Sequence, residues 1–242
     1  AMECLDGIDA MVISPVVPDN APFVLKAKEM GVYVTGELEM AYQLSSGEMV
    51  AITGTNGKTT STYLLKHILE KTVGAKVGLI GTNQNLIGSE VIETERTTPE
   101  SYELHALFAR MRDAGCTHVI MEVSSHSLVL DRVHGIRFAV GAFTNLTQDH
   151  LDFHKTMDAY CEAKAELFRR CRLAVVNADD SYSDRILAAA ACPVLTTGVH
   201  RPADLRGEDL ELLAQSVREM PSCFAIPITA VSYTHLTLPT TR

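Results

Sequence analysis

The sequence predicts an α/β protein, with a mostly parallel P-loop sheet that carries helices on both faces and follows a small partial α/β domain. From residue 49 onward, short apolar segments alternate with segments of helical periodicity, which is typical of a parallel sheet covered on both sides. A glycine-rich turn ending in Gly57-Lys58-Thr59 joins the first of these strands to the first helix. Such a turn typically binds phosphate groups.

The expected elements follow from hydrophobic periodicity. Before residue 49, the strands are Met11 to Ser14 and Val32 to Val34, and the helices are Phe23 to Met30 and Glu37 to Leu44. From residue 49, the strands are Met49 to Ile52, Lys76 to Ile80, His118 to Met121, Ala139 to Thr144 and Leu173 to Val176. The helices expected between and after them cover 60–72, 100–114, 156–171 and 181–191.

Composition indicates an ordinary water-soluble protein. The 242 residues are 46% hydrophobic and 21% charged, with a net charge of −9 and no Lys/Arg-rich block, which argues against nucleic-acid or membrane-surface partners. No apolar run is long enough to span a membrane and no signal peptide opens the chain, so we expect a cytoplasmic monomer. The six cysteines form no C-x-x-C pair, which favours reduced thiols.

The turn after the first strand is the strongest functional signal. Its backbone N–H groups and the following helix N-terminus can surround a phosphate, Lys58 adds a positive charge, and the Thr59 hydroxyl can reach Mg²⁺. The general G-x-x-x-x-G-K-[ST] pattern has a glycine where this chain has Ile52, and the first glycine here is Gly54. An ordinary strand-to-helix turn is the alternative, and ATP binding is the favoured interpretation.

Polar side chains also follow other strands, where ligands of parallel sheets bind. Glu122 ends a buried strand and is a candidate Mg²⁺ ligand, although a surface glutamate would fit the same pattern. His150 lies in a polar segment, 144–154, and by spacing alone is as compatible with a loop histidine as with a ligand. Lys164 lies on an otherwise apolar helix stripe, where a lysine snorkels, pairs with a carboxylate or is chemically altered.

The segment 94–100 is expected to enter a helix with Thr98 as N-cap and Pro99 at the first helical position. A capping role would explain these residues. The hydroxyl pair Thr97 and Thr98 could equally bind a phosphate or a sugar.

Six motifs in order resemble the central domain of the Mur ligases, over about residues 49–185. They are Gly54-Thr-Asn-Gly-Lys-Thr-Thr60, Thr97-Thr-Pro-Glu100, Glu122-Val-Ser-Ser-His126 with Arg132, Thr144-Asn-Leu-Thr-Gln-Asp-His-Leu-Asp152, Ala163-Lys164 and Val176-Asn-Ala-Asp-Asp180. The likeness is strongest to the branch that adds the third residue of the muramoyl peptide. Residues 7–45 look more like the branch that adds D-glutamate, so a chimera joined near the phosphate loop is one interpretation.

The resemblance implies an ATP-dependent, amide-forming ligase of peptidoglycan biosynthesis, which adds an amino acid to UDP-N-acetylmuramoyl-L-Ala-D-Glu through an acyl phosphate. Lys58, His150 and Lys164 would be catalytic, and Lys164 would be carbamylated. The nucleotide would contact Gly54, Thr55, Asn56, Gly57, Lys58, Thr59, Thr60 and Asn145. Mg²⁺ would be held by Thr59, Glu122, His150 and Lys164, and the muramoyl peptide by Thr97, Thr98, Ser124 and Arg132.

The expected domains are a partial N-terminal domain at 1–48, an ATP-binding central domain at 49–230 that is incomplete at its C-terminal end, and a non-native tail at 231–242. The domain that binds the incoming amino acid in this family has no counterpart here, so we expect no ligase turnover from this chain. For the same reason, the sequence does not show whether the added amino acid is diaminopimelate or lysine. The alternatives are a D-glutamate ligase, a folylpolyglutamate synthetase relative and a non-catalytic nucleotide-binding fragment.

Overall fold

The computed structural model describes residues 10–13, 20–36, 47–208, 211–212, 231–232 and 235–237. Its main feature is a ten-stranded sheet with the strand order β14-β11-β10-β9-β8-β3-β7-β4-β5-β6. All neighbouring pairs from β11 to β4 are parallel, and β14, β5 and β6 add antiparallel pairs at the two edges. The predicted fold class, a mostly parallel sheet in an α/β protein, is confirmed.

The strands of this sheet are β3 (Glu48–Thr53), β4 (Val77–Ile80), β5 (Asn85–Ile87), β6 (Glu90–Ile92), β7 (His118–Glu122), β8 (Phe138–Phe143), β9 (Cys171–Asn177), β10 (Val194–Gly198), β11 (Leu205–Glu208) and β14 (His235–Thr237). The helices are α3 (Lys58–Thr72), α4 (Ser101–Asp113), α5 (Ser125–Val129), α6 (Leu151–His154), α7 (Met157–Ala165), the 3₁₀ helix η1 (Glu166–Arg169) and α8 (Ser183–Ala189). A separate two-residue pair joins β12 (Glu211–Leu212) to β13 (Val231–Ser232).

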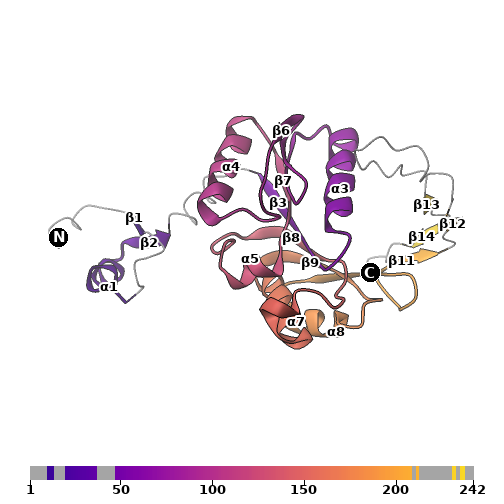
Figure 1. Cartoon of the computed structure of the whole chain (residues 1–242). Coiled ribbons are helices and arrows are strands. Elements are labelled where there is room, and N and C mark those ends of the chain that lie inside the picture. Colours follow the sequence, from indigo (N-terminus) through magenta and orange to yellow (C-terminus); the bar gives the residue numbers. More distant parts are fainter. Residues whose placement is uncertain are drawn as a thin grey trace.

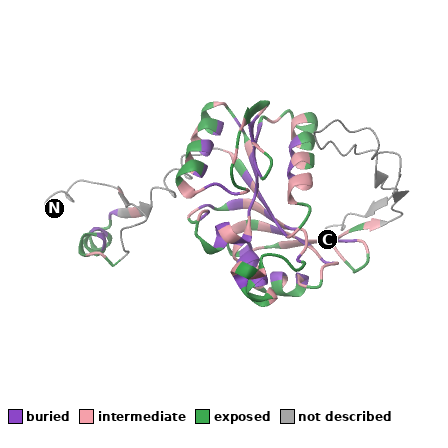
Figure 2. Ribbon diagram, in the orientation of Figure 1, coloured by how far each residue is buried: buried purple, intermediate pink, exposed green. Residues whose placement is uncertain are grey.

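Helices cover both faces of the sheet, with α3 and α4 on opposite sides (Figure 1). Successive residues of β3 point to opposite faces, as strand geometry requires. Met49 and Ala51 join the larger apolar core, which includes Leu104 of α4, whereas Ile52 belongs to a smaller cluster that packs against Leu65 of α3. Burial is concentrated in the central strands and on the sheet-facing sides of the helices (Figure 2).

The N-terminal segment forms a small unit of its own. Strands β1 (Ala10–Ile13) and β2 (Tyr33–Gly36) pair in parallel, and α1 (Pro22–Glu29) lies between them in the chain. Ala27 and Val32 form its buried apolar contact. The strands and first helix predicted here are therefore found, whereas the predicted helix Glu37–Leu44 and most of the expected tail lie outside the described residues.

The structure differs from the predicted elements in several places, and it adds the short elements α5, α6 and β11, which the sequence prediction did not include. The sequence prediction omitted the β5–β6 hairpin and β10, whose segments are short or interrupted by polar residues. The helix expected over 156–171 ends at Ala165 and continues as one 3₁₀ turn, because β9 already begins at Cys171. Among the described cysteines, Cys116, Cys161, Cys171 and Cys192 are free thiols.

Packing of α4 on the sheet should contribute strongly to stability. Leu104 is fully buried, so Leu104→Ala is expected to lower the free energy of unfolding by about 2 to 5 kcal/mol through lost apolar contact and a residual cavity. Urea unfolding followed by circular dichroism measures this. Tyr102→Ala is the matched control on the same helix, because Tyr102 is 86% exposed. Equal losses in the two variants would contradict the assigned face of α4.

Candidate nucleotide-binding site

The turn after β3 has the geometry of a phosphate-binding loop. Gly57 is the N-cap of α3 with φ of 85° and no side-chain cap, so the first backbone N–H groups of the helix are not used by a capping side chain. Thr59 and Thr60 occupy the first turn of α3. A helix start of this kind favours an anion, because its N–H groups carry partial positive charge.

Gly54 is needed at the start of this loop for steric reasons. Its φ of +156° lies in a region that side chains disfavour, and a Cβ at this position would lie 1.9 Å from Oγ1 of Thr144. The loop therefore passes directly against the segment that follows β8. This contact explains why position 54 requires a glycine.

The segment after β8 fixes the shape of the loop by hydrogen bonds. The Thr55 N–H donates to the Asn145 carbonyl at 2.9 Å, and the Asn56 N–H donates to Oδ1 of Asn145 at 2.9 Å. Asn145 Nδ2 and Thr144 Oγ1 both donate to the Asn56 carbonyl, at 3.1 and 2.7 Å. Thr147 N–H donates to Oγ1 of Thr55 at 3.0 Å. Asn145, predicted as a nucleotide contact, thus also shapes the loop.

Lys58 folds back over the loop. Its Nζ donates to the carbonyls of Gly54 at 2.9 Å and Thr55 at 3.0 Å. Burial lowers the pKa of Lys58, and the nearby carboxylates of Glu122 and Asp149 partly offset that effect. The ammonium group is therefore held by the loop backbone, and the charges of both carboxylates favour its protonated form.

Glu122 is fully buried at the end of β7. Its carboxylate accepts hydrogen bonds from the N–H of Thr82 at 3.0 Å and from the hydroxyl of Thr82 at 2.9 Å. The alternative of a surface glutamate is therefore wrong. Sequence reasoning missed Thr82, although it follows β4 and the rule of polar residues at strand ends would have found it.

Lys164 lies inside the same site. It is 2% exposed, and its Nζ donates to the Gly54 carbonyl at 3.0 Å and lies 4.5 Å from the ring centroid of Tyr160. Burial lowers its pKa to about 7, with a further contribution from the charge of Lys58. No described carboxylate pairs with it, so it neither snorkels to solvent nor forms the ion pair weighed from the sequence.

An aromatic cluster extends from Lys164 toward the loop surface. His154 stacks on Tyr160 with centroids 4.9 Å apart and shares a 2.8 Å hydrogen bond with Oγ of Ser125. Burial, assisted by neighbouring positive charge, lowers the pKa of His154 to about 4, so this ring is neutral at pH 7. Sequence reasoning gave no separate role to His154 or Tyr160, and their helical spacing alone carried no signal for one.

His150 lies at the exposed edge of this cluster. It adopts a left-handed backbone with φ of 51° as N-cap of α6. Its side chain is 47% exposed, its Nε2 is 3.5 Å from Oδ2 of Asp149, and its ring contacts that of His126. In the part of the chain that the structure describes, no three His, Cys, Asp or Glu side chains group as a metal site.

The second predicted group of residues lies beside Glu122. The hydroxyl of Thr98 donates to the Glu122 carbonyl at 2.9 Å and accepts from the Ser124 N–H at 3.1 Å. Thr97 contacts Thr82 through their hydroxyls at 3.0 Å. Arg132 donates to the Thr98 carbonyl at 3.3 Å and pairs with Glu100 at 2.8 Å. All four predicted peptide contacts therefore lie together, one strand away from the phosphate loop.

Thr98 is not the N-cap of α4, so that prediction is wrong. The helix starts at Ser101, and Glu100 is the N-cap in a reciprocal capping box with Glu103. The Thr98 hydroxyl bonds to Glu122 at the end of β7 and to Ser124 two residues later, and not to the helix end. Its 1% exposure also shows that it belongs to the interior of the site.

Comparison with known proteins identifies the family. Residues 52–234 match the Mur ligase middle domain. The chain belongs to the Mur ligase family. This confirms the resemblance seen in the six motifs, whereas the roles of individual residues and the domain boundaries stay predictions.

Curated Mur ligases are similar over part of their length. The UDP-N-acetylmuramoyl-L-alanyl-D-glutamate--2,6-diaminopimelate ligase of Clostridium botulinum is 52% identical over 170 residues, which are 70% of this chain and 35% of that protein. The enzyme of the same name from Corynebacterium glutamicum is 46% identical over 202 residues, 81% of this chain and 38% of its own. The chain thus spans little more than a third of these relatives.

A solved structure of a UDP-N-acetylmuramoyl-L-alanyl-D-glutamate--2,6-diaminopimelate ligase shares the fold. The two structures superpose with a TM-score of 0.63 at 24% sequence identity, and the match covers 84% of this chain and 48% of the solved chain. In the described residues, no helix is long and apolar enough to cross a membrane.

The lowered pKa of Lys164 predicts a pH-dependent stability. Between pH 7 and about 10.5, the unfolded chain keeps a proton on Lys164 that the folded protein has lost, so folding becomes more favourable as pH rises. The unfolding free energy of the wild type relative to Lys164→Met should therefore increase by at most about 1.4 kcal/mol per pH unit across this range. It should be constant below pH 6.

Urea unfolding of both proteins in carbonate-free, metal-free buffer measures this difference. The comparison with Lys164→Met removes the contributions of all other titrating groups that the two proteins share. A difference that does not change from pH 6 to 10 would contradict a depressed lysine pKa in the folded state.

Proposed function

We propose that the chain is the nucleotide-binding part of an ATP-dependent ligase that extends UDP-N-acetylmuramoyl-L-Ala-D-Glu by one amino acid. The observation that carries the proposal is the arrangement of Lys58, Glu122 and Lys164 around a loop with an uncapped helix start. The names of the relatives supply the substrate class and favour 2,6-diaminopimelate as the added amino acid. The substrate, the acceptor and the activity of the whole protein are parts of this proposal.

In the proposed reaction, the backbone N–H groups at the start of α3 and the Lys58 ammonium group hold the ATP phosphates, because the N–H groups of Thr55 and Asn56 already donate to Asn145. The terminal carboxylate of the muramoyl dipeptide attacks the γ-phosphorus, ADP leaves, and the amine of the incoming amino acid then displaces phosphate to form the amide. Two anions must approach each other in the first step, so a concentration of positive charge is the main requirement. Lys58 and the N-terminus of α3 supply it from the protein.

Mg²⁺ would be held by the Thr59 hydroxyl, the Glu122 carboxylate, His150 and a carbamylated Lys164. The surroundings of Lys164 fit a carbamate: the amine is buried, its pKa is about 7, and Lys58 raises the cost of a second positive charge. An anion on Lys164 would convert that repulsion into attraction. Bound Mg²⁺ would neutralise charge on the phosphates, which is its usual contribution to phosphoryl transfer.

Thr97, Thr98, Ser124 and Arg132 would hold the muramoyl peptide. Their position supports this role, because Thr98 and Ser124 pack directly on β7 beside Glu122. Arg132 donates a hydrogen bond to the Thr98 carbonyl and pairs with Glu100, so its guanidinium lies at the edge of this group of residues. Guanidinium groups bind carboxylates and phosphates in two-point contacts.

The first test is calorimetric titration of Mg·ATP into the 242-residue chain. Lys58→Ala is expected to weaken binding at least tenfold, because a charge-assisted contact to phosphate contributes more than about 1.4 kcal/mol. Lys71→Ala is the matched control, since Lys71 lies in the last turn of the same helix. Equal affinity in wild type and Lys58→Ala would refute nucleotide binding at this loop.

The carbamate is tested separately by ¹³C NMR in ¹³C-bicarbonate. We expect a carbamate resonance in the wild type that is absent from Lys164→Gln, because the neutral amine of Lys164 can react with dissolved CO₂. Lys155→Gln is the control, since Lys155 lies outside the buried cluster on an exposed loop. The same spectrum for wild type and Lys164→Gln would show that Lys164 is not modified.

A further inference from the structure

A second concave site lies at the other end of the sheet. A pocket of about 490 Å³ is lined by His134, Gly135, Ile136, Arg137, Arg169, Arg170, Cys171 and Arg172. Strands β8 and β9 begin here, whereas the phosphate loop lies beyond their carboxyl ends. Six residues of β8 separate the two ends, a distance of roughly 20 Å.

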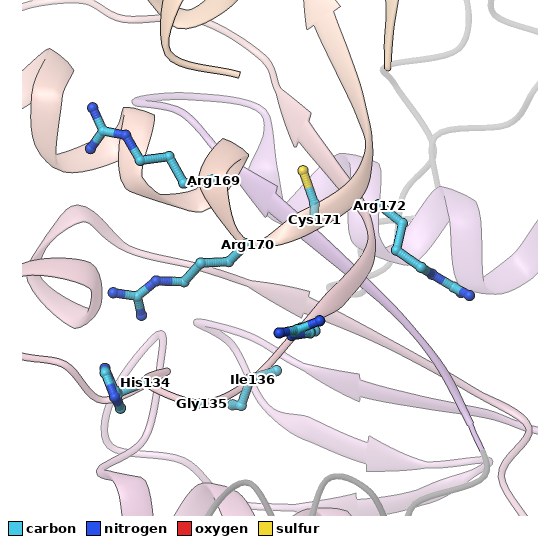
Figure 3. A pocket seen from close by; sticks show the side chains of 8 residues that line it. His134, Gly135, Ile136, Arg169, Arg170, Cys171 and Arg172 are labelled. Carbon is cyan, nitrogen blue, oxygen red and sulfur yellow. The ribbon is translucent and has the colours of Figure 1, made fainter. Parts of the chain in front are cut away.

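The lining is basic in a protein that is acidic overall. Four arginines and one histidine line this pocket, although the chain carries a net charge of −9. In Figure 3, the guanidinium of Arg170 and the ring of His134 lie on the same side of the pocket, and the side chain of Arg172 points to the opposite side. The volume is in the usual range for sites of small ligands.

Two of the arginines are already engaged by carboxylates. Arg169 pairs with Glu162 at 2.7 Å and with Glu166. Arg172 pairs with Glu48. These two residues contribute to the electrostatic field of the pocket, but their guanidinium groups are not the ones left for a ligand.

Arg137 and Arg170 have unused capacity. Nη1 of Arg170 is buried without a hydrogen-bond partner, and its Nη2 is 3.6 Å from Oδ1 of Asp131. Asp131 also lies 3.6 Å from the ring of His134, so one carboxylate faces two basic groups. Arg137 is exposed, and no carboxylate in the described part of the chain pairs with it.

We propose that this pocket binds a small oxyanion with more than one negative charge, through Arg137 and Arg170. Nη2 of Arg170, which lies 3.6 Å from Oδ1 of Asp131, and the exposed guanidinium of Arg137 can each donate hydrogen bonds to an oxyanion in the pocket. Guanidinium groups bind phosphates and carboxylates alike in two-point contacts, so the ligand is a phosphate-containing metabolite or a polycarboxylate. This site is distinct from the ATP site and does not depend on the proposed ligase activity.

The test uses the Lys58→Ala chain, in which anion binding at the phosphate loop is weakened. Pyrophosphate and citrate are titrated in separate calorimetric experiments at low ionic strength without Mg²⁺. We expect one anion per chain with at least one of these probes, and the preferred probe shows whether phosphate or carboxylate is the ligand chemistry. No binding of either would overturn the proposal.

Substitutions then locate the site. Adding Arg137→Gln and Arg170→Gln should weaken binding at least tenfold, whereas adding Arg110→Gln should leave it unchanged, because Arg110 pairs with Glu90 on another part of the surface. Arg137→Gln alone changes an exposed side chain, so it tests the site even if the Arg170 variant does not fold. It should weaken binding at least threefold with an unchanged melting temperature. Unchanged affinity in a folded Arg137→Gln variant would overturn the proposed site.

Discussion

The carbonyl oxygen of Gly54 is the point on which the site depends. It accepts hydrogen bonds from two ammonium groups, those of Lys58 and Lys164, at 2.9 and 3.0 Å. Burial is the main cause of the depressed pKa of Lys164, and the positive charge of Lys58 at the same oxygen lowers it further. The site is therefore built to accept negative charge, and the backbone of the loop occupies the place between the two lysines.

The topology explains how distant segments reach this point. The order β8-β3-β7-β4 places four parallel strands side by side, so the residues that follow them emerge at one edge of the sheet. The loop after β3 then lies between Asn145 after β8 and Glu122 at the end of β7. The same arrangement leaves the amino ends of β8 and β9, with their arginines, at the opposite edge.

Much of this arrangement could be predicted from the sequence. The apolar segments that became β3, β4, β7, β8 and β9 were placed within two residues of their observed ends, because buried parallel strands have few polar interruptions. Glu122 was found by its position after such a strand. The resemblance to the Mur ligases, not periodicity, singled out Asn145 and favoured a role for Lys164.

Other features required coordinates. The role of Thr98 could not be read locally, because its hydroxyl is engaged by a strand 24 residues away and not by the adjacent helix. Tyr160 gains its importance only from neighbours in space, such as Thr55 and Lys164. The basic pocket is assembled from the turn before β8 and from the segment that joins the end of η1 to the start of β9. Its residues carry no pattern that sets them apart from ordinary surface arginines.

The dependence of the loop on the segment after β8 has a consequence for synthesis of the protein. Asn56 and Asn145, which hold each other through side-chain and backbone groups, are separated by 89 residues. β8, which pairs with β3 in the sheet, is therefore synthesised long after β3. Contacts between residues so far apart in the sequence form late in folding. A nascent chain that has exposed only β3 and α3 has the complete glycine-lysine motif but lacks the partner that gives the loop its shape.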